Sequence, residues 1–146
     1  MHQGVLSDKG KEIFPRLKRF GAFYLAGGTA LAIQIGHRIS ADFDLFSEKE
    51  IPKHLLSTVK KTFSPKKTIV SVNNPDELTV FVDETKITFL KYPFPVLLSF
   101  VVYKGVKMLS AQEISATKIY TIGRRGSYKD YVDLYFIIST GRMSLD

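Results

Sequence analysis

The chain has 146 residues, which fits one folded domain spanning 1–146. Of these residues, 45% are hydrophobic, and this fraction excludes a largely disordered protein. It contains no cysteine, which excludes disulfides, thiolate metal sites and cysteine nucleophiles. The formal net charge of +7 indicates either a plain basic surface or attraction to a polyanion such as RNA. No apolar run is long enough for a membrane helix and no signal-peptide core follows Met1, so we expect a cytoplasmic protein without a membrane partner.

Helix and strand patterns alternate in the first half of the chain. Ser7 is placed to cap a short helix, which Pro15 is expected to kink or end. Apolar runs, acidic–apolar alternation and helical spacing then predict a buried strand over 23–26, a buried helix over 29–35, a strand over 41–46 and a polar helix over 51–63.

The second half continues with short strands and ends in two helices. Asp83-Glu84-Thr85 is expected to form a hairpin turn. The expected elements are strands over 68–72, 77–82, 86–90 and 98–103, and helices over 111–122 and 128–139. This order predicts one α+β domain, with a mixed sheet and helices packed on it.

Gly27-Gly28-Thr29 lies between a predicted strand and a predicted helix. Two glycines let the backbone approach a bulky anion, and the start of the helix offers free N–H groups and the positive end of its dipole. The Thr29 hydroxyl can donate to a phosphate or cap the helix. The same sequence is also an ordinary strand-to-helix turn, so alone it leaves both interpretations open.

Asp42-Phe43-Asp44 places two acids at alternate positions of a predicted strand. Residues i and i+2 point to the same face, so both carboxylates project together. Two hard oxygen ligands suit Mg²⁺, which takes one or two carboxylates plus substrate phosphates. The alternative is a pair of solvated acids on an edge strand.

Arg38 and Ser40 lie between these two motifs. Arg38 can fork onto a phosphate or pair with one of the neighbouring aspartates. His37 is expected to be a surface residue near the end of the preceding helix.

The two last helices carry further charged residues. Lys118 lies on the first, while Asp130 and Asp133 share a face of the second because they are three residues apart. They are either site residues or simply the wet side of the helix, and Tyr131 and Tyr135 are expected in the core.

A basic loop precedes the last helix. Arg124, Arg125 and Lys129 lie in or just after this glycine-flanked loop and are predicted to contact RNA phosphates.

Three segments together resemble the AbiEii/AbiGii-type toxin family of the nucleotidyltransferase superfamily, close to the MenA-like toxins. The matching segments are Tyr24-Leu-Ala-Gly-Gly-Thr-Ala-Leu-Ala32, His37-Arg-Ile-Ser-Ala-Asp-Phe-Asp-Leu-Phe46, and Lys118 with Lys129-Asp-Tyr-Val-Asp-Leu-Tyr135. The similarity runs from about residue 6 to residue 139.

The resemblance implies transfer of a nucleotide from an NTP to an acceptor, which in related toxins is often tRNA, with Mg²⁺ (or Mn²⁺) as cofactor and an antitoxin as partner. It assigns the triphosphate to Gly27, Gly28 and Thr29, and a phosphate contact to Lys118. The metal is assigned to Asp42 and Asp44, and Asp130 or Asp133 completes the site.

One departure from the family pattern leaves other functions open. Thr88 occupies a position where many superfamily members carry a third carboxylate. A nucleotide- or RNA-binding protein without turnover is therefore one alternative, and kinase-type phosphoryl transfer by the same site is another.

Overall fold

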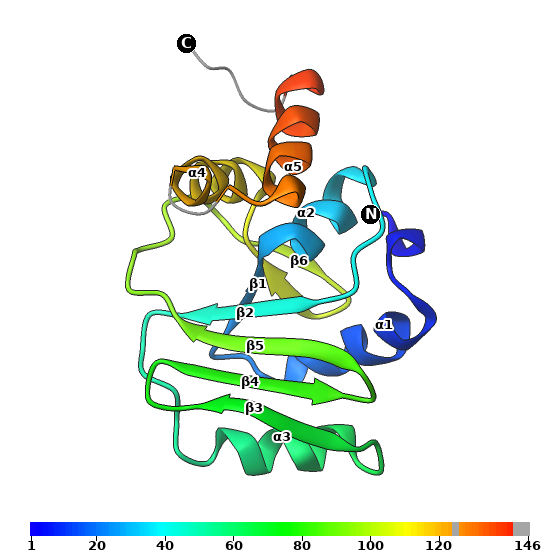
Figure 1. Cartoon of the computed structure of the whole chain (residues 1–146), viewed down its shortest axis with the longest axis vertical. Coiled ribbons are helices and arrows are strands. Elements are labelled where there is room, and N and C mark those ends of the chain that lie inside the picture. Colours follow the sequence, from blue (N-terminus) through cyan, green and yellow to red (C-terminus); the bar gives the residue numbers. More distant parts are fainter. Residues whose placement is uncertain (124–125, 142–146) are drawn as a thin grey trace.

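A seven-stranded mixed sheet organises the chain, and the computed structural model describes residues 1–123 and 126–141 (Figure 1). The strand order is β3-β4-β5-β2-β1-β7-β6. The strands are β1 (Tyr24–Ala26), β2 (Phe43–Ser47), β3 (Thr68–Asn73), β4 (Glu77–Val82), β5 (Thr85–Lys91), β6 (Val101–Tyr103) and β7 (Val106–Met108). The predicted α+β class, with a mixed sheet and helices packed on it, is confirmed.

Helices pack around this sheet (Figure 1). The α-helices are α1 (Asp8–Ile13), α2 (Gly27–Ile35), α3 (Leu55–Phe63), α4 (Ala111–Ile122) and α5 (Tyr128–Ser139), and the 3-10 helices are η1 (Gln3–Val5) and η2 (Phe14–Arg19). Helix α2 packs on β1 and β2 and also contacts α4 and α5, so it lies between the sheet and the C-terminal helices. No described helix is both long and apolar enough to cross a membrane.

The N-terminal helices begin and end where Ser7 and Pro15 predict. The Ser7 hydroxyl accepts a hydrogen bond of 3.0 Å from the Gly10 amide and caps α1. Pro15 stands at the start of η2, so the α-helix ends at Ile13 and the chain continues as a 3-10 helix. The predicted break at Pro15 is confirmed.

The central strand β2 places Asp44 in the middle of the sheet. It pairs antiparallel with β1 and parallel with β5, which sets Asp44 opposite Ala26 on one side and Thr88 on the other. Phe43 and Leu45, which alternate with Asp44, are buried in the core. Asp44 and the core residues of this strand therefore lie on opposite faces, as the two-residue period predicts. Asp42 lies just before the strand, which was expected to begin at residue 41.

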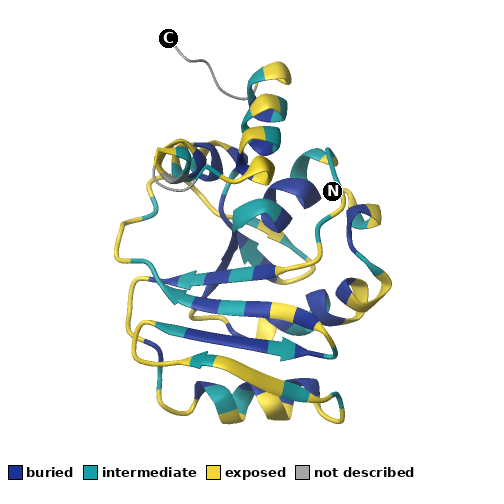
Figure 2. Cartoon of the chain, viewed as in Figure 1, coloured by how far each residue is buried: buried dark blue, intermediate teal, exposed yellow. Residues whose placement is uncertain are grey.

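The sheet is covered unevenly (Figure 2). Strand β4 is mostly buried, whereas the edge strand β3 is mostly exposed. The largest fully buried side chains of the core are the rings of Phe14, Phe43, Phe63 and Phe89.

One predicted strand was too long, and the strand after it was not predicted. The strand expected over 98–103 is limited to β6, and Leu98 is 45% exposed. A second hairpin follows it, because Lys104 and Gly105 both have positive φ and join β6 to the unpredicted strand β7. The hairpin expected at Asp83-Glu84 is present, with positive φ at both residues.

Candidate functional site

The glycine turn lies directly against the acid of β2. Gly27 has φ of +67°, and a Cβ atom added to it would lie 2.6 Å from Asp44 Oδ2. Only glycine combines this dihedral with this close approach. Helix α2 starts here, and the side chain of its N-cap residue, Ala26, makes no capping hydrogen bond. The turn therefore places the N-terminus of a helix beside the Asp44 carboxylate.

Gly28 makes room for a different group. A Cβ atom added here would overlap the Arg38 Nη2 atom and lie 3.2 Å from Asp133 Oδ2. The second glycine is therefore required by a neighbouring ion pair, while the residue still borders the cavity described below.

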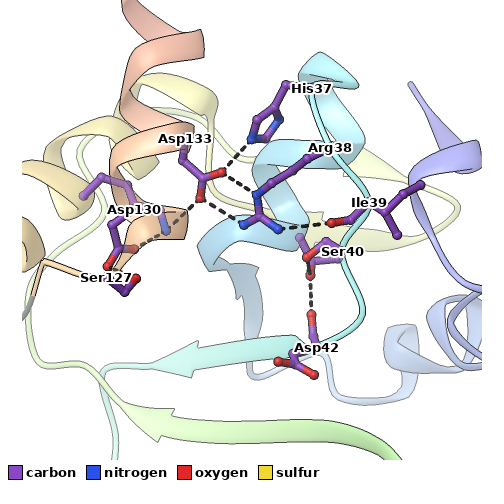
Figure 3. A network of polar contacts seen from close by, with 10 residues as sticks. His37, Arg38, Ile39, Ser40, Asp42, Ser127, Asp130 and Asp133 are labelled. Carbon is purple, nitrogen blue, oxygen red and sulfur yellow. Dashed lines mark hydrogen bonds and ion pairs between the residues drawn. The ribbon is translucent and has the colours of Figure 1, made fainter.

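Thr29 ties α2 to the segment that carries Asp42. Its hydroxyl lies 2.6 Å from the Ser40 hydroxyl and donates to the backbone oxygen of Asp42. Thr29 is 2% exposed, so in this arrangement its hydroxyl positions the start of β2. The Asp42 side chain is exposed, and Figure 3 shows its carboxylate pointing away from Ser40.

Asp133 is the centre of a buried polar cluster (Figure 3). Its Oδ1 accepts from His37 Nε2 at 2.6 Å and from Arg38 Nε at 2.7 Å. Its Oδ2 accepts from Arg38 Nη2 at 3.1 Å and lies 2.9 Å from Lys118 Nζ. One fully buried carboxylate thus joins α5, α4 and the segment between α2 and β2.

The pKa of Asp133 is lowered from its ordinary value. Burial by itself raises this pKa, but the hydrogen bonds from His37, Arg38 and Lys118 together outweigh it. Asp133 is therefore a buried anion whose charge is balanced by the guanidinium and ammonium groups around it.

Lys118 bridges the two acids of α5. Its Nζ donates to Asp130 Oδ1 at 2.7 Å, and Ser127 donates to Asp130 Oδ2 at 2.7 Å. Asp130 and Asp133 are 1% and 0% exposed, so the interpretation of these acids as the wet side of the helix is wrong. Of the two, Asp130 borders the cavity.

Two further expectations from the sequence were wrong, and Arg38 has an aspartate as its partner. The His37 side chain is 1% exposed, so it belongs to the Asp133 cluster and not to the surface. Arg38 pairs with Asp133 of α5. Tyr131 and Tyr135 are 53% and 67% exposed, which places them outside the core.

One cavity of about 220 Å³ brings most of the predicted residues together. From the glycine turn to β2 it is bordered by Gly28, Thr29, Arg38, Ser40, Asp42 and Asp44, and from the other side by Lys86, Lys118, Ser127, Lys129 and Asp130. A smaller cavity of about 100 Å³ adjoins it and includes Gly27. The sequence did not indicate Lys86, which reaches the cavity from β5.

A larger cleft of about 530 Å³ lies over the sheet next to Asp44. Its border includes Thr88 and, on β4, Thr79 and Glu77. The Thr79 hydroxyl donates to Glu77 Oε2 at 3.1 Å and lies 3.4 Å from the Thr88 hydroxyl. Glu77 was also missed from the sequence, because only strand pairing brings β4 to this face.

The predicted RNA contacts are placed only in part. Lys129 is exposed and borders the 220 Å³ cavity. Arg124 and Arg125 lie outside the described residues.

Comparison with known proteins identifies the fold. A candidate nucleotidyltransferase from Helicobacter pylori superposes with a TM-score of 0.68 at 20% identity, over 91% of this chain and 69% of that one. A second H. pylori protein, JHP933, gives 0.65 at 19% identity, over 92% and 68%. The Megavirus polyadenylate synthase gives 0.63 at 15% identity, over 91% of this chain and 31% of that one. The chain therefore has a nucleotidyltransferase fold.

Sequence comparison adds a relative without an assigned activity. An uncharacterised protein of Aquifex aeolicus is 35% identical over 118 residues, which cover 80% of this chain. The chain spans 57% of the length of that relative. No family model matches the sequence.

Proposed function

We propose that the chain is a nucleotidyltransferase that transfers a nucleotide from an NTP to an acceptor hydroxyl. The single observation that carries the proposal is the 220 Å³ cavity, which is bordered by Asp44 of the central strand β2, by Asp42 just before it, by the first residues of helix α2 and by several cationic side chains. The nucleotidyltransferase fold supports the same class of reaction.

The paired acids fit a metal that is bound together with substrate. Among residues 1–123 and 126–141, no group of three or more His, Asp or Glu side chains is arranged to hold a metal ion. Asp42 and Asp44 nevertheless border one cavity, and Mg²⁺ is often held by one or two carboxylates plus phosphate oxygens. Mg²⁺ or Mn²⁺ bound there would neutralise phosphate charge and polarise the α-phosphorus.

The protein's own groups bind and orient the triphosphate in this scheme. The first backbone N–H groups of α2 donate hydrogen bonds to phosphate oxygens. Lys118 uses two of its three N–H groups on Asp130 and Asp133, and the third remains for phosphate. Lys86 and Lys129 add positive charge at the rim of the cavity.

The reaction exchanges one phosphorus–oxygen bond for another. The acceptor oxygen attacks the α-phosphorus in line, the bond from that phosphorus to the bridging oxygen breaks, and pyrophosphate leaves. The hydroxyl proton needs an acceptor, and Thr88 cannot serve as one. We assign this role to Glu77, which lies in the same cleft as Asp44 and is oriented by the Thr79 hydroxyl.

RNA, and tRNA in particular, is the acceptor class we propose. The net charge of +7 favours a polyanion, and Lys129 is exposed at the edge of the cavity. The resemblance to AbiEii/AbiGii-type toxins adds a toxin role with a cognate antitoxin to this proposal.

Labelled nucleotides test the proposal against its alternatives. The chain is incubated with Mg²⁺, a tRNA pool and an NTP that carries label at the α- or the γ-phosphate. Label from the α-position alone on the acceptor means nucleotidyl transfer, and label from the γ-position means a kinase. No transfer of either, with NTP binding retained, means a binding protein.

Substitution of the paired acids links the result to the site. Asp42→Asn with Asp44→Asn should reduce α-label transfer at least a hundredfold, while Asp8→Asn, at a fully exposed position on α1, should leave it unchanged. Equal transfer by the double variant and the wild type would refute the assignment.

A further inference from the structure

A pocket of about 280 Å³ lies beside the site, and four of the side chains that line it are aromatic. We refer to it as the aromatic pocket. Its rings are Tyr24 from β1, Tyr92 and Phe94 from the segment after β5, and Tyr120 from α4.

The aromatic pocket adjoins the cavities around Asp44. Leu109 and Thr117 border both the aromatic pocket and the 100 Å³ cavity that contains Gly27 and Asp44. Tyr92, Thr117 and Tyr120 also border the cleft over the sheet. The aromatic pocket therefore lies next to the cavity that contains the glycine turn.

The rings of the pocket contact one another, and two of them are half-exposed. Tyr92 stacks on Phe46 at 5.0 Å and meets the edge of Phe94 at 5.0 Å. Phe94 and Tyr120, whose centroids are 6.5 Å apart, are 52% and 50% exposed. Large aromatic side chains left half-exposed around a cavity offer stacking surface to a ligand.

The segment that carries Phe94 is fixed to α4. Glu113 Oε1 accepts from the Leu97 amide at 2.5 Å and from the Leu98 amide at 3.1 Å. The segment that carries Phe94 is thus held in place without a ligand, and this lowers the entropy cost of ordering it on binding.

The pocket also contains a polar group without a partner. Tyr24 is 6% exposed, and among the described residues nothing hydrogen bonds to its hydroxyl. Burial raises the pKa of Tyr24 to about 12, with smaller contributions from Tyr92, Glu48 and Glu113. The hydroxyl is therefore protonated at neutral pH and available to donate to a ligand.

We propose that the aromatic pocket receives the base of the nucleoside triphosphate, stacked on Phe94 and accepting the Tyr24 hydroxyl hydrogen. This inference rests on the proposed function. A nucleobase matches the pocket because it combines a flat ring with acceptor atoms at its edge. The base of the NTP fits better than a base of the acceptor, because the 100 Å³ cavity next to the pocket contains the glycine turn to which we assign the triphosphate.

Calorimetry with one ligand that carries a nucleobase and one that lacks it tests the proposal. Mg²⁺–NTP and Mg²⁺–tripolyphosphate are titrated into the wild type, Phe94→Leu, Tyr24→Phe and the control Tyr135→Leu. Phe94→Leu should weaken NTP binding about tenfold by loss of stacking, with tripolyphosphate binding unchanged. Tyr24→Phe should reduce the difference in affinity among the four NTPs severalfold without lowering the melting temperature. Tyr135, which is exposed on α5 and does not line the pocket, should tolerate its change.

The outcomes separate this inference from the proposed function. Unchanged NTP affinity in Phe94→Leu, with α-label transfer intact, overturns the base site and leaves the reaction standing. Weaker tRNA binding with unchanged NTP binding assigns the pocket to the acceptor and also overturns the proposal. The proposal is also overturned if the wild type binds all four NTPs equally and no more tightly than it binds tripolyphosphate. A wild type that binds no NTP and transfers no label refutes both.

Discussion

Asp133→Asn tests whether the buried cluster holds the C-terminal helices on the site. The carboxylate accepts from His37, Arg38 and Lys118 and is 0% exposed. Asparagine is nearly isosteric but has one acceptor oxygen, and its amide turns two donors toward the buried cations. Removal of one partner from a buried ion pair costs about 3–5 kcal/mol. We expect a loss near the lower end, about 3 kcal/mol, because one oxygen remains.

This loss corresponds to a large change in melting temperature. With about 2.1 cal/mol/K per residue, the unfolding entropy of the chain is about 0.3 kcal/mol/K, so the melting temperature should fall by about 10 °C. Urea unfolding followed by circular dichroism measures the free energy directly. The matched control is Asp8→Asn, which removes an exposed pair with Lys11 at 3.6 Å and should cost less than about 0.5 kcal/mol.

The dependence of the loss on pH gives a second, independent check. Because the folded pKa of Asp133 is lowered, its contribution is complete above the unfolded pKa of about 3.9 and is lost as pH falls toward the folded pKa. The difference between wild type and Asp133→Asn should be constant above about pH 5 and should narrow below about pH 4. An unchanged melting temperature, or a difference that widens in acid, would refute a structural role for this carboxylate.

Three other substitutions test the remaining parts of the site. Gly27→Ala should cost about 1–3 kcal/mol in urea unfolding and displace Asp44, since it adds a Cβ at positive φ beside that carboxylate; an unchanged stability would contradict the close approach. Glu77→Gln should lower the transfer rate at least tenfold and abolish the acid limb of its pH profile with NTP affinity retained, and a wild-type rate would remove Glu77 as the base. Lys129→Ala should reduce the log–log salt slope of RNA binding by about 0.7, and an unchanged slope would exclude a phosphate contact there.

The sequence alone determined the parts of the site that depend on local periodicity. The two-residue period of a strand put Asp42 and Asp44 on the cavity side, with Phe43 in the core. Gly27-Gly28 likewise marked a turn between strand and helix, and Gly27 has the positive φ that glycine allows. These features follow from backbone geometry over a few residues, so they can be predicted without knowledge of the rest of the fold.

Only the tertiary structure decided the partners of the buried charges and the position of the aromatic pocket. Arg38 and Asp133 are 95 residues apart in sequence, and no local pattern distinguishes a buried acid on α5 from a solvated one. Glu77 and Tyr24 acquire their surroundings through strand order and helix packing in the same way. Periodicity fixes which face of an element a side chain occupies, whereas long-range packing fixes what lies opposite that face.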